Sequence, residues 1–133
     1  MSHEAPRVGI VLVSHSARLA EGTADLAGQV SGGTVRVVAA GGTEDGELGT
    51  SAEKVARALA SAEAGAGVLV LPDLGSAVLT VRAMFEDMTG VRAVLADAPF
   101  VEGAVAATVT AAAGADLKAV AAAAEEAWHA RKL

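Results

Sequence analysis

The sequence of 133 residues contains no cysteine, three prolines and very few aromatic residues, 2% of the total. The absence of cysteine excludes a disulfide framework, thiolate chemistry and a zinc site with sulfur ligands, and it favours a reducing compartment such as the cytoplasm. The scarcity of aromatic side chains and a net charge of −6 leave neither stacking platforms nor a basic field. We therefore expect no nucleic-acid partner.

Long hydrophobic runs are also missing. The first apolar stretch, Val8 to Val13, is too short for the core of a signal peptide or a membrane span, and later alanine-rich stretches are interrupted by Glu102, Gly114 and Asp116. We expect a soluble, untargeted protein with no membrane partner. A composition of 53% hydrophobic and 20% charged residues is typical of a globular protein, and the length fits a single domain over residues 1–133.

Short apolar runs alternate with longer segments of helical period along the chain. This alternation is typical of βαβ units and predicts an α/β fold with a parallel sheet. The predicted strands cover residues 8–13, 35–39, 68–71 and 91–95. Helices are expected between them, and two more over about residues 101–113 and after Asp116.

The helical period also predicts which residues face the core. The expected buried faces are Leu19, Thr23, Leu26 and Val30 in the first helix, Ala52, Val55, Ala56 and Leu59 in the second, Ala77, Val81, Met84 and Met88 in the third, and Leu117, Val120, Ala121, Ala124 and Trp128 in the last. Three of these helices have predicted N-terminal capping residues: Thr50, which has Glu53 at capping-box spacing, Ser76 and Asp116.

Three loops follow the first three predicted strands, and ligands collect beyond the carboxyl ends of strands in an open parallel sheet. The first loop is Ser14-His15-Ser16, between a strand and a helix start, so the backbone of His15 is fixed while its ring points into the crevice. A neutral imidazole attacks phosphorus well, and a carboxylate on its other nitrogen fixes the tautomer. Asp73, after the third strand, is the expected carboxylate.

Small residues near His15 lie at predicted helix N-termini, whose free amides can receive a phosphoryl group. The expected phosphoryl-binding residues are Ser14, Ser16, Thr50, Ser51, Gly75 and Ser76. Arg18 begins the first helix, where the helix dipole disfavours a cation, so it is either a contact for phosphate or donor or a plain surface residue. Position alone also leaves open that His15 has only a structural hydrogen-bonding role.

The remaining titratable residues are expected to be solvated. His3 lies in the starting segment, His129 lies on the polar side of the last helix, and Glu44, Asp45 and Glu47 lie in a glycine-rich loop. A catalytic metal needs two or more convergent ligands, and the chain offers one well-placed histidine with one aspartate. Neither a metal nor another cofactor is expected.

Four motifs in order resemble a known family. They are Gly9 to Gly22 (GIVLVSHSARLAEG), Leu48-Gly49-Thr50, Leu71 to Ala77 (LPDLGSA) and Ala98 to Gly103 (APFVEG). With this spacing the chain resembles, over nearly its whole length, the phosphotransferase subunit of bacterial dihydroxyacetone kinase. The first domain of that subunit is similar to the IIA domain of the mannose-type sugar phosphotransferase system. The resemblance implies a flavodoxin-like, mostly parallel sheet of four to five strands with helices on both faces.

The resemblance also implies a reaction. His15 would accept a phosphoryl group from the carrier protein HPr and transfer it to ADP bound in the nucleotide-binding subunit of the kinase, with Asp73 orienting the imidazole. A homodimer is implied as well. Some family members carry further HPr-like and enzyme-I-like domains after the first, and because this chain stops at Leu133 we expect it to use separate donors.

Three alternatives remain at this point. A IIA component of a sugar transporter would share the chemistry and differ in the acceptor, although the stretch from Pro99 to Gly103 favours the kinase branch. A metal chelatase of tetrapyrrole biosynthesis would want a second metal-facing histidine, for which His129 is a poor match. A non-catalytic binding module would use His15 and Asp73 only for a structural hydrogen bond, and it predicts no phosphorylation.

Overall fold

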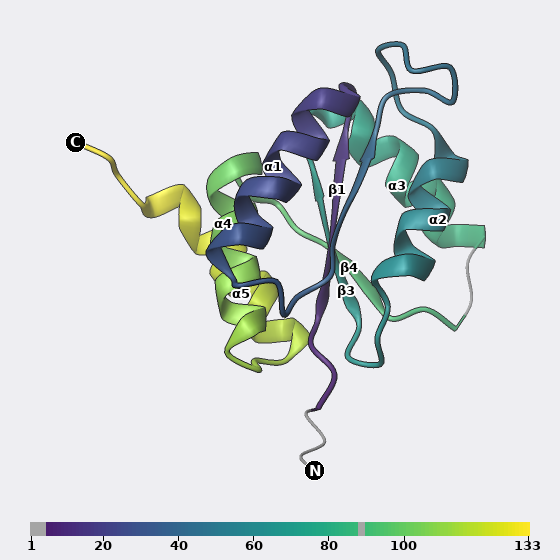
Figure 1. The fold of residues 1–133 in the computed structure, drawn as a ribbon. Coiled ribbons are helices and arrows are strands. Elements are labelled where there is room, and N and C mark those ends of the chain that lie inside the picture. The colour runs from purple at the N-terminus through teal and green to yellow at the C-terminus, as the bar shows by residue number, and fades with distance from the viewer. Residues whose placement is uncertain (1–4, 88–89) are drawn as a thin grey trace.

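A single parallel sheet forms the centre of the computed structural model, which describes residues 5–87 and 90–133. Its strands are β1 (Gly9–Ser14), β2 (Val37–Gly41), β3 (Val68–Pro72) and β4 (Ala93–Leu95). They lie in the order β2-β1-β3-β4, and all three pairings are parallel (Figure 1). The predicted α/β fold is confirmed, and within the described residues the sheet has four strands.

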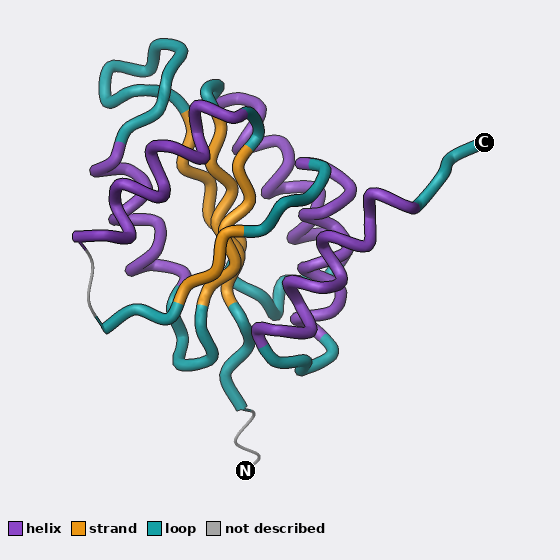
Figure 2. The backbone as a smooth tube through the Cα atoms, turned by 180° about the vertical axis from the view of Figure 1, so that it is seen from behind, coloured by secondary structure: helices purple, strands orange, loops and turns teal. Residues whose placement is uncertain are grey.

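Five α-helices cover both faces of this sheet in the described part of the chain. They are α1 (Ala17–Val30), α2 (Ala52–Ala62), α3 (Gly75–Asp87), α4 (Phe100–Ala112) and α5 (Leu117–Glu126), and a 3-10 turn (Ala127–His129) follows α5. Helices α1, α4 and α5 pack on one face, while α2 and α3 pack on the other, which gives two apolar cores (Figures 1 and 2). Because both faces are covered, every residue of β1 is buried.

The register of the strands aligns their carboxyl ends. Ser14 at the end of β1 pairs with Gly41 of β2, and Val13 pairs with Pro72 of β3. The backbone N–H of Asp73 donates to the carbonyl of Val13 at 2.9 Å, which continues the ladder one residue past β3. The loops after β1 and β3 therefore begin side by side.

The buried face of α1 differs from the predicted one. Ala20, Thr23 and Ala27 are buried, whereas the larger Leu19, Leu26 and Val30 are 44%, 48% and 51% exposed. The helix lies so close to β2 that a Cβ atom at Gly41 would be 2.9 Å from the Ala20 Cβ. Only small side chains fit this contact, so the prediction was right for Thr23 and wrong for the three larger residues.

Several smaller predictions were wrong as well. Strand β2 begins at Val37 and β4 at Ala93, two residues later than predicted in each case. Ala52 is exposed, and Ala56 and Ala121 are only half-buried. Trp128 is 58% exposed, because α5 ends at Glu126 and Trp128 lies in the 3-10 turn that follows, not on the buried face of the helix. Met88 and His3 lie outside the described residues.

Candidate functional site

His15 lies at the junction of β1 and α1. Ser14 is the last residue of β1, and Ser16 is the N-cap of α1, where its hydroxyl accepts from the Leu19 N–H at 3.2 Å. The His15 carbonyl accepts from the Gly49 N–H at 2.9 Å, so the loop after β2 also holds this backbone. These contacts confirm the expected place of His15 between a strand end and a helix start.

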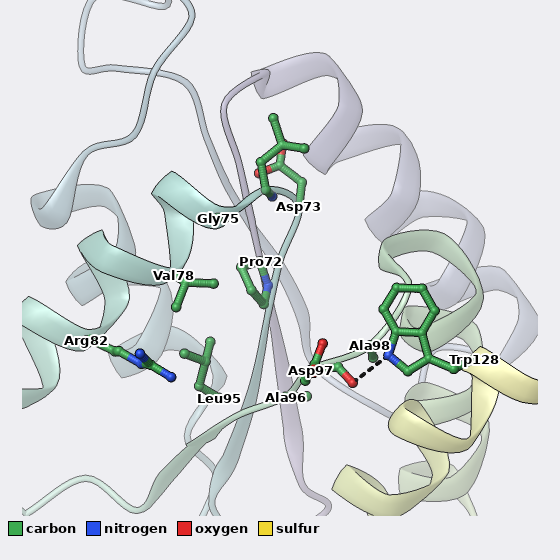
Figure 3. Close-up of a pocket in the computed structure, with 11 residues that line it drawn as sticks. Pro72, Asp73, Gly75, Val78, Arg82, Leu95, Ala96, Asp97, Ala98 and Trp128 are labelled. Atoms are coloured by element: carbon green, nitrogen blue, oxygen red, sulfur yellow. Dashed lines mark hydrogen bonds between the residues drawn. The ribbon is translucent and has the colours of Figure 1, made fainter.

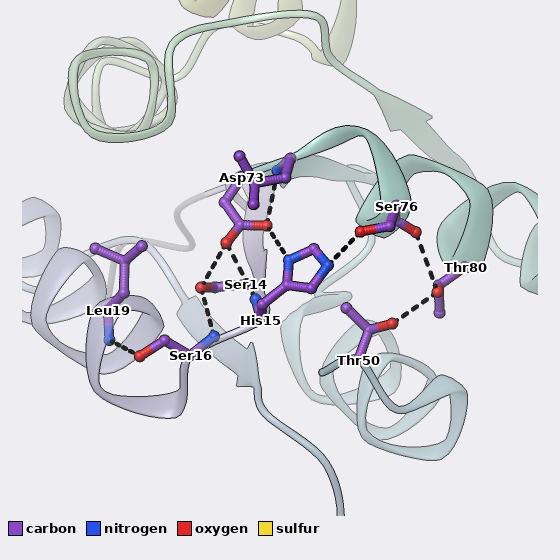
Figure 4. Close-up of polar contacts among 9 residues, drawn as sticks. Ser14, His15, Ser16, Leu19, Thr50, Asp73, Ser76 and Thr80 are labelled. Atoms are coloured by element: carbon purple, nitrogen blue, oxygen red, sulfur yellow. Dashed lines mark hydrogen bonds and ion pairs between the residues drawn. The ribbon is translucent and has the colours of Figure 1, made fainter. Parts of the chain in front are cut away.

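Asp73 contacts His15 through both of its carboxylate oxygens (Figure 4). Oδ1 lies 2.9 Å from His15 Nδ1 and accepts from the Leu74 N–H at 2.7 Å. Oδ2 accepts from the His15 backbone N–H at 3.1 Å and from the Ser14 hydroxyl at 2.9 Å. The Ser14 oxygen in turn accepts from the Ser16 N–H at 3.0 Å. One carboxylate thus fixes the ring, its backbone and the start of α1.

The ionisation of Asp73 follows from these contacts. Its side chain is only 8% exposed. This burial acts to raise the pKa of Asp73, but the hydrogen bonds from the His15 N–H, the Ser14 hydroxyl and the His15 ring outweigh it and hold the pKa below the usual 3.8. Asp73 is therefore an ionised acceptor at neutral pH.

The ionised carboxylate determines the tautomer of His15. A carboxylate can only accept, so Nδ1 of a neutral imidazole must carry the proton and Nε2 must carry the lone pair. Nε2 contacts the hydroxyl of Ser76, which then donates to it (Figure 4). The side chain of His15 is 24% exposed, so the ring is partly open to solvent while its Nδ1 faces the carboxylate.

Ser76 is not the N-cap that the sequence predicted. Helix α3 begins at Gly75, which makes Ser76 its second residue and leaves its hydroxyl free to contact the imidazole. The first backbone N–H groups of a helix have no partner within the helix, and the helix dipole favours an anion there. The N-terminus of α3 is thus beside Nε2 and suited to a phosphoryl group.

The cap of α2 is shifted by one residue from the prediction. Ser51, not Thr50, is the N-cap, and its hydroxyl accepts from the Lys54 N–H at 3.2 Å. That hydroxyl also donates to Glu44 at 3.1 Å and has no bond to His15 within the described residues. Thr50 instead lies 2.8 Å from the hydroxyl of Thr80 on α3.

The structure thus divides the predicted site residues into groups. Asp73, Ser14 and Ser76 contact His15 directly or through the shared carboxylate, and Ser16 and Gly75 begin the two neighbouring helices. Thr50 does not contact His15, and it is linked to Ser76 only through the hydroxyl of Thr80. Arg18 is exposed on α1 and Ser51 faces Glu44, so neither joins the cluster around His15.

Sequence reasoning missed two contributors. The first is Thr80, whose hydroxyl donates to the Ser76 carbonyl at 3.4 Å and joins α3 to Thr50. It follows Ser76 by four residues in a helix, so the i, i+4 spacing was the signal that could have found it. The second is the backbone of Gly49, with a φ of +139°, which no side-chain pattern would have indicated.

The acidic loop after β2 is partly ordered by an ion pair. Glu44 Oε1 lies 3.0 Å from Arg57 Nη2, and this hydrogen bond, with that from Ser51, lowers the pKa of Glu44. Asp45 and Glu47 are exposed, as predicted.

A pocket of about 420 Å³ lies beside the cluster, between the ends of β3 and β4 (Figure 3). Its lining includes Pro72, Asp73, Arg82, Leu95 and Trp128. The indole N–H of Trp128 donates to the Asp97 carbonyl at 3.0 Å, which fixes the far wall. None of the helices in residues 5–87 and 90–133 has both the length and the apolar character needed to cross a membrane.

Comparisons with known proteins bear on the family and the fold. The family model described as PTS system fructose IIA component (EIIA-man) matches residues 9–121. A solved protein of unknown function, EF1359, is 33% identical with a TM-score of 0.81, and the match covers 90% of this chain and 94% of the other. A sigma-54 interaction domain protein from Enterococcus faecalis, 19% identical with a TM-score of 0.71 over 95% of this chain and 93% of the other, shares the fold.

Two relatives are named as subunits of a kinase. The chain is 39% identical over 116 residues to the phosphoryl donor subunit DhaM of the PEP-dependent dihydroxyacetone kinase of Escherichia coli, covering 83% of this chain and 25% of that protein. A DhaM subunit of Listeria innocua is 43% identical over 54 residues, 41% of this chain and 43% of that protein. The match therefore spans less than half the length of these relatives.

Proposed function

The chain belongs to the PTS system fructose IIA component family, and we propose that it is a phosphohistidine carrier whose acceptor atom is Nε2 of His15. One observation carries this proposal. Asp73 accepts from Nδ1 and from the backbone of the same histidine, so the lone pair is confined to Nε2 of a ring that is partly exposed. A nucleophile with a fixed tautomer, next to a helix N-terminus, is what phosphoryl transfer requires.

The transfer step uses groups that are already in place. Nε2 attacks the phosphorus of a donor phosphohistidine in line, the N–P bond of the donor breaks, and a new N–P bond forms on His15. The ring becomes positively charged, and the ionised Asp73 stabilises it through Nδ1. Once Nε2 carries the phosphoryl group, the Ser76 hydroxyl donates to a phosphoryl oxygen instead. The first backbone N–H groups of α3 also donate to phosphoryl oxygens.

The proposal extends to the partners. We propose that the donor is HPr, that the acceptor is ADP in the nucleotide-binding subunit of a dihydroxyacetone kinase, that the carrier is a homodimer and that it acts in the cytoplasm. The relatives named as phosphoryl donor subunits of such kinases support this acceptor.

A second candidate is a IIA component that serves a sugar transporter. The description of the matching family favours it, because that description names a fructose component. The chemistry at His15 would be the same, and the two candidates differ only in which acceptor discharges the protein.

The test is phosphoryl labelling from phosphoenolpyruvate in the presence of enzyme I and HPr. We expect acid-labile, base-stable label on the wild type and none on His15→Ala. The matched control is His129→Ala, since His129 is exposed in the 3-10 turn and has no part in the cluster. Addition of the kinase nucleotide-binding subunit with ADP should then discharge the label.

Two results would contradict parts of the proposal. An unlabelled wild type, with donors that label a known carrier, would leave His15 and Asp73 with a structural role only. Label that is lost to a sugar-transporter subunit and not to ADP would assign the protein to the transporter branch.

A further inference from the structure

Ser76, His15 and Asp73 form a continuous chain of hydrogen bonds (Figure 4). The hydroxyl of Ser76 contacts Nε2 of His15, and Nδ1 of the same ring lies 2.9 Å from Oδ1 of Asp73. The lone pair of the ring is on Nε2, so the hydroxyl donates to it. A hydroxyl, an imidazole and a carboxylate connected in this order form the catalytic triad of serine hydrolases, which recurs on unrelated folds.

Each of these three groups is in the state that a nucleophilic serine requires. The carboxylate of Asp73 is ionised at neutral pH and can stabilise an imidazolium ring. The lone pair on Nε2 can take the proton of the hydroxyl. Ser76 is exposed, so its oxygen is accessible to a molecule from solution. A base that a third group orients in this way activates a serine that would otherwise be a weak nucleophile.

The first turn of α3 supplies hydrogen-bond donors next to the hydroxyl. Within residues 5–87 and 90–133, the backbone N–H groups of Gly75 and Ser76 donate to no protein acceptor. A Cβ atom at Gly75 would have no heavy atom of another part of the chain within 4 Å, so the space over this backbone is open. Two such amides at a helix N-terminus can stabilise the negative oxygen of a tetrahedral intermediate, as an oxyanion hole does.

An apolar pocket adjoins the same turn. Leu74 and Gly75, which directly precede Ser76, belong to the lining of the pocket of about 420 Å³ between β3 and β4 (Figure 3). The side chains of Val78 and Leu95 add further apolar surface to it. A pocket of this size lies within the usual range of small-molecule sites. An apolar group attached to the Ser76 oxygen therefore has a place to bind.

The charges of the lining restrict the class of substrate. The lining contains two carboxylates, Asp73 and Asp97, and one cation, Arg82. This excess of negative charge disfavours an anionic substrate. The pocket is thus suited to a neutral ester with a short acyl chain.

We propose that Ser76 is a nucleophile in the unphosphorylated protein and accepts acyl groups from small neutral esters, with His15 as the general base and Asp73 orienting the ring. This activity goes beyond the phosphoryl-carrier function. It does not depend on that function, although both use His15.

The acyl transfer balances with the groups of this chain and one water molecule. Oγ of Ser76 attacks the carbonyl carbon while Nε2 of His15 takes the hydroxyl proton, and the two free amides hold the oxyanion. The bond to the alcohol then breaks, and the alcohol leaves with the proton from Nε2. Water attacks the acyl carbon, Nε2 passes a proton from the water to Oγ, and the carboxylic acid is released.

Phosphorylation of His15 switches this activity off. A phosphoryl group on Nε2 occupies the lone pair that has to accept the Ser76 proton. The triad is therefore complete only in the unphosphorylated protein. The phosphorylation state is thus a control that leaves every residue in place.

A fluorophosphonate probe tests the nucleophile, because an activated serine attacks its phosphorus and fluoride leaves. We expect a single probe on Ser76, located by mass spectrometry of the peptide that contains it. His15→Ala and Asp73→Asn should each lower the labelling rate by about 100-fold or more, since they remove the base or its orientation. The matched control is Ser61→Ala, an exposed serine on α2, which should react like wild type.

Hydrolysis of p-nitrophenyl acetate tests the substrate class. We expect a burst of about one equivalent of nitrophenolate as Ser76 is acetylated, followed by slower turnover. Ser76→Ala should abolish the burst. Wild type that is first phosphorylated with phosphoenolpyruvate, enzyme I and HPr should lose the burst in proportion to the phosphorylated fraction, and it should regain the burst after the phosphoryl group is removed.

Several results would overturn the proposal. They are a probe or acetyl group on His15 in place of Ser76, labelling of Ser76 that His15→Ala leaves unchanged, and a full burst from the phosphorylated protein. Phosphoryl transfer from HPr is measured on the same preparations. A protein that takes the phosphoryl group but leaves Ser76 unlabelled contradicts this inference alone, and one that labels Ser76 but takes no phosphoryl group contradicts the carrier function alone.

Discussion

Asp73 contacts His15 twice, with Oδ1 2.9 Å from the ring Nδ1 and Oδ2 3.1 Å from the backbone nitrogen. The first contact sets the tautomer, and the second holds the backbone at the end of β1. A single carboxylate at the end of the neighbouring strand therefore controls both the chemistry and the position of the imidazole.

Asp73→Asn should slow phosphoryl transfer to His15 by about 100-fold. An amide at position 73 can donate to Nδ1, which moves the proton to Nε2 and removes the lone pair. Initial labelling rates with HPr in excess measure the effect. A rate within about two-fold of wild type would show that Asp73 does not set the tautomer.

Ser76→Ala should lower the transfer rate by roughly 10- to 100-fold, because it removes one donor to the transferring phosphoryl group. Stability should stay within about 0.5 kcal/mol of wild type, since Ser76 is exposed. Asp116→Ala is the control: it removes the α5 cap, whose carboxylate accepts from the Ala119 N–H at 2.9 Å, and should cost about 1 kcal/mol of unfolding free energy with little loss of rate. Urea denaturation and labelling rates together test the pair, and an unchanged rate in Ser76→Ala would contradict the role given to its hydroxyl.

Gly41→Ala should destabilise the protein by about 2 kcal/mol or more and reduce labelling. A Cβ there would lie 2.6 Å from the Ser16 carbonyl oxygen and 2.7 Å from the Ala17 Cα, both backbone atoms, so the start of α1 must move. Gly22→Ala, in the same helix with nothing within 4 Å, should instead stabilise by about 0.5–1 kcal/mol. Thermal unfolding compares the two, and an equal effect would refute the packing argument.

The stability that Asp73 contributes should depend on pH. Its pKa in the folded protein is lower than the usual 3.8, so the contribution is complete above that value and is lost as pH falls through the lower folded-state pKa. The difference in unfolding free energy between wild type and Asp73→Asn should be constant near neutral pH and shrink in acid. Urea titrations at a series of pH values measure it, and a difference that grows on acidification would contradict the sign.

The order of strands and helices along the chain could be predicted from the sequence, because it depends on local hydrophobic patterns. The run of residues that forms β1 is apolar at odd and even positions alike, which indicates a strand covered on both faces. Every residue of β1 is buried. The position of His15 followed from the same run, since it lies one residue after the strand ends. Asp73 followed in the same way from β3.

The helix faces were harder to predict, and α1 shows why. The largest apolar residues, Leu19, Leu26 and Val30, are exposed because the close approach of β2 admits only Ala20, Thr23 and Ala27. Large apolar side chains dominate a hydrophobic pattern. The pattern therefore predicts the wrong buried residues where a neighbouring strand leaves room only for small side chains. Two predicted caps also failed, Thr50 by one residue and Ser76 by two, because loop contacts decide where a helix begins.

The sequence by itself determined the order of strands and helices, the strand-end positions of His15 and Asp73, and the absence of thiol chemistry, because each depends on local pattern or composition. Only the tertiary structure decided that Asp73 binds both the ring and the backbone of His15 and that Ser76 faces Nε2. These contacts depend on the order of the strands within the sheet and on their register, which bring together residues about 60 positions apart and which no local pattern encodes.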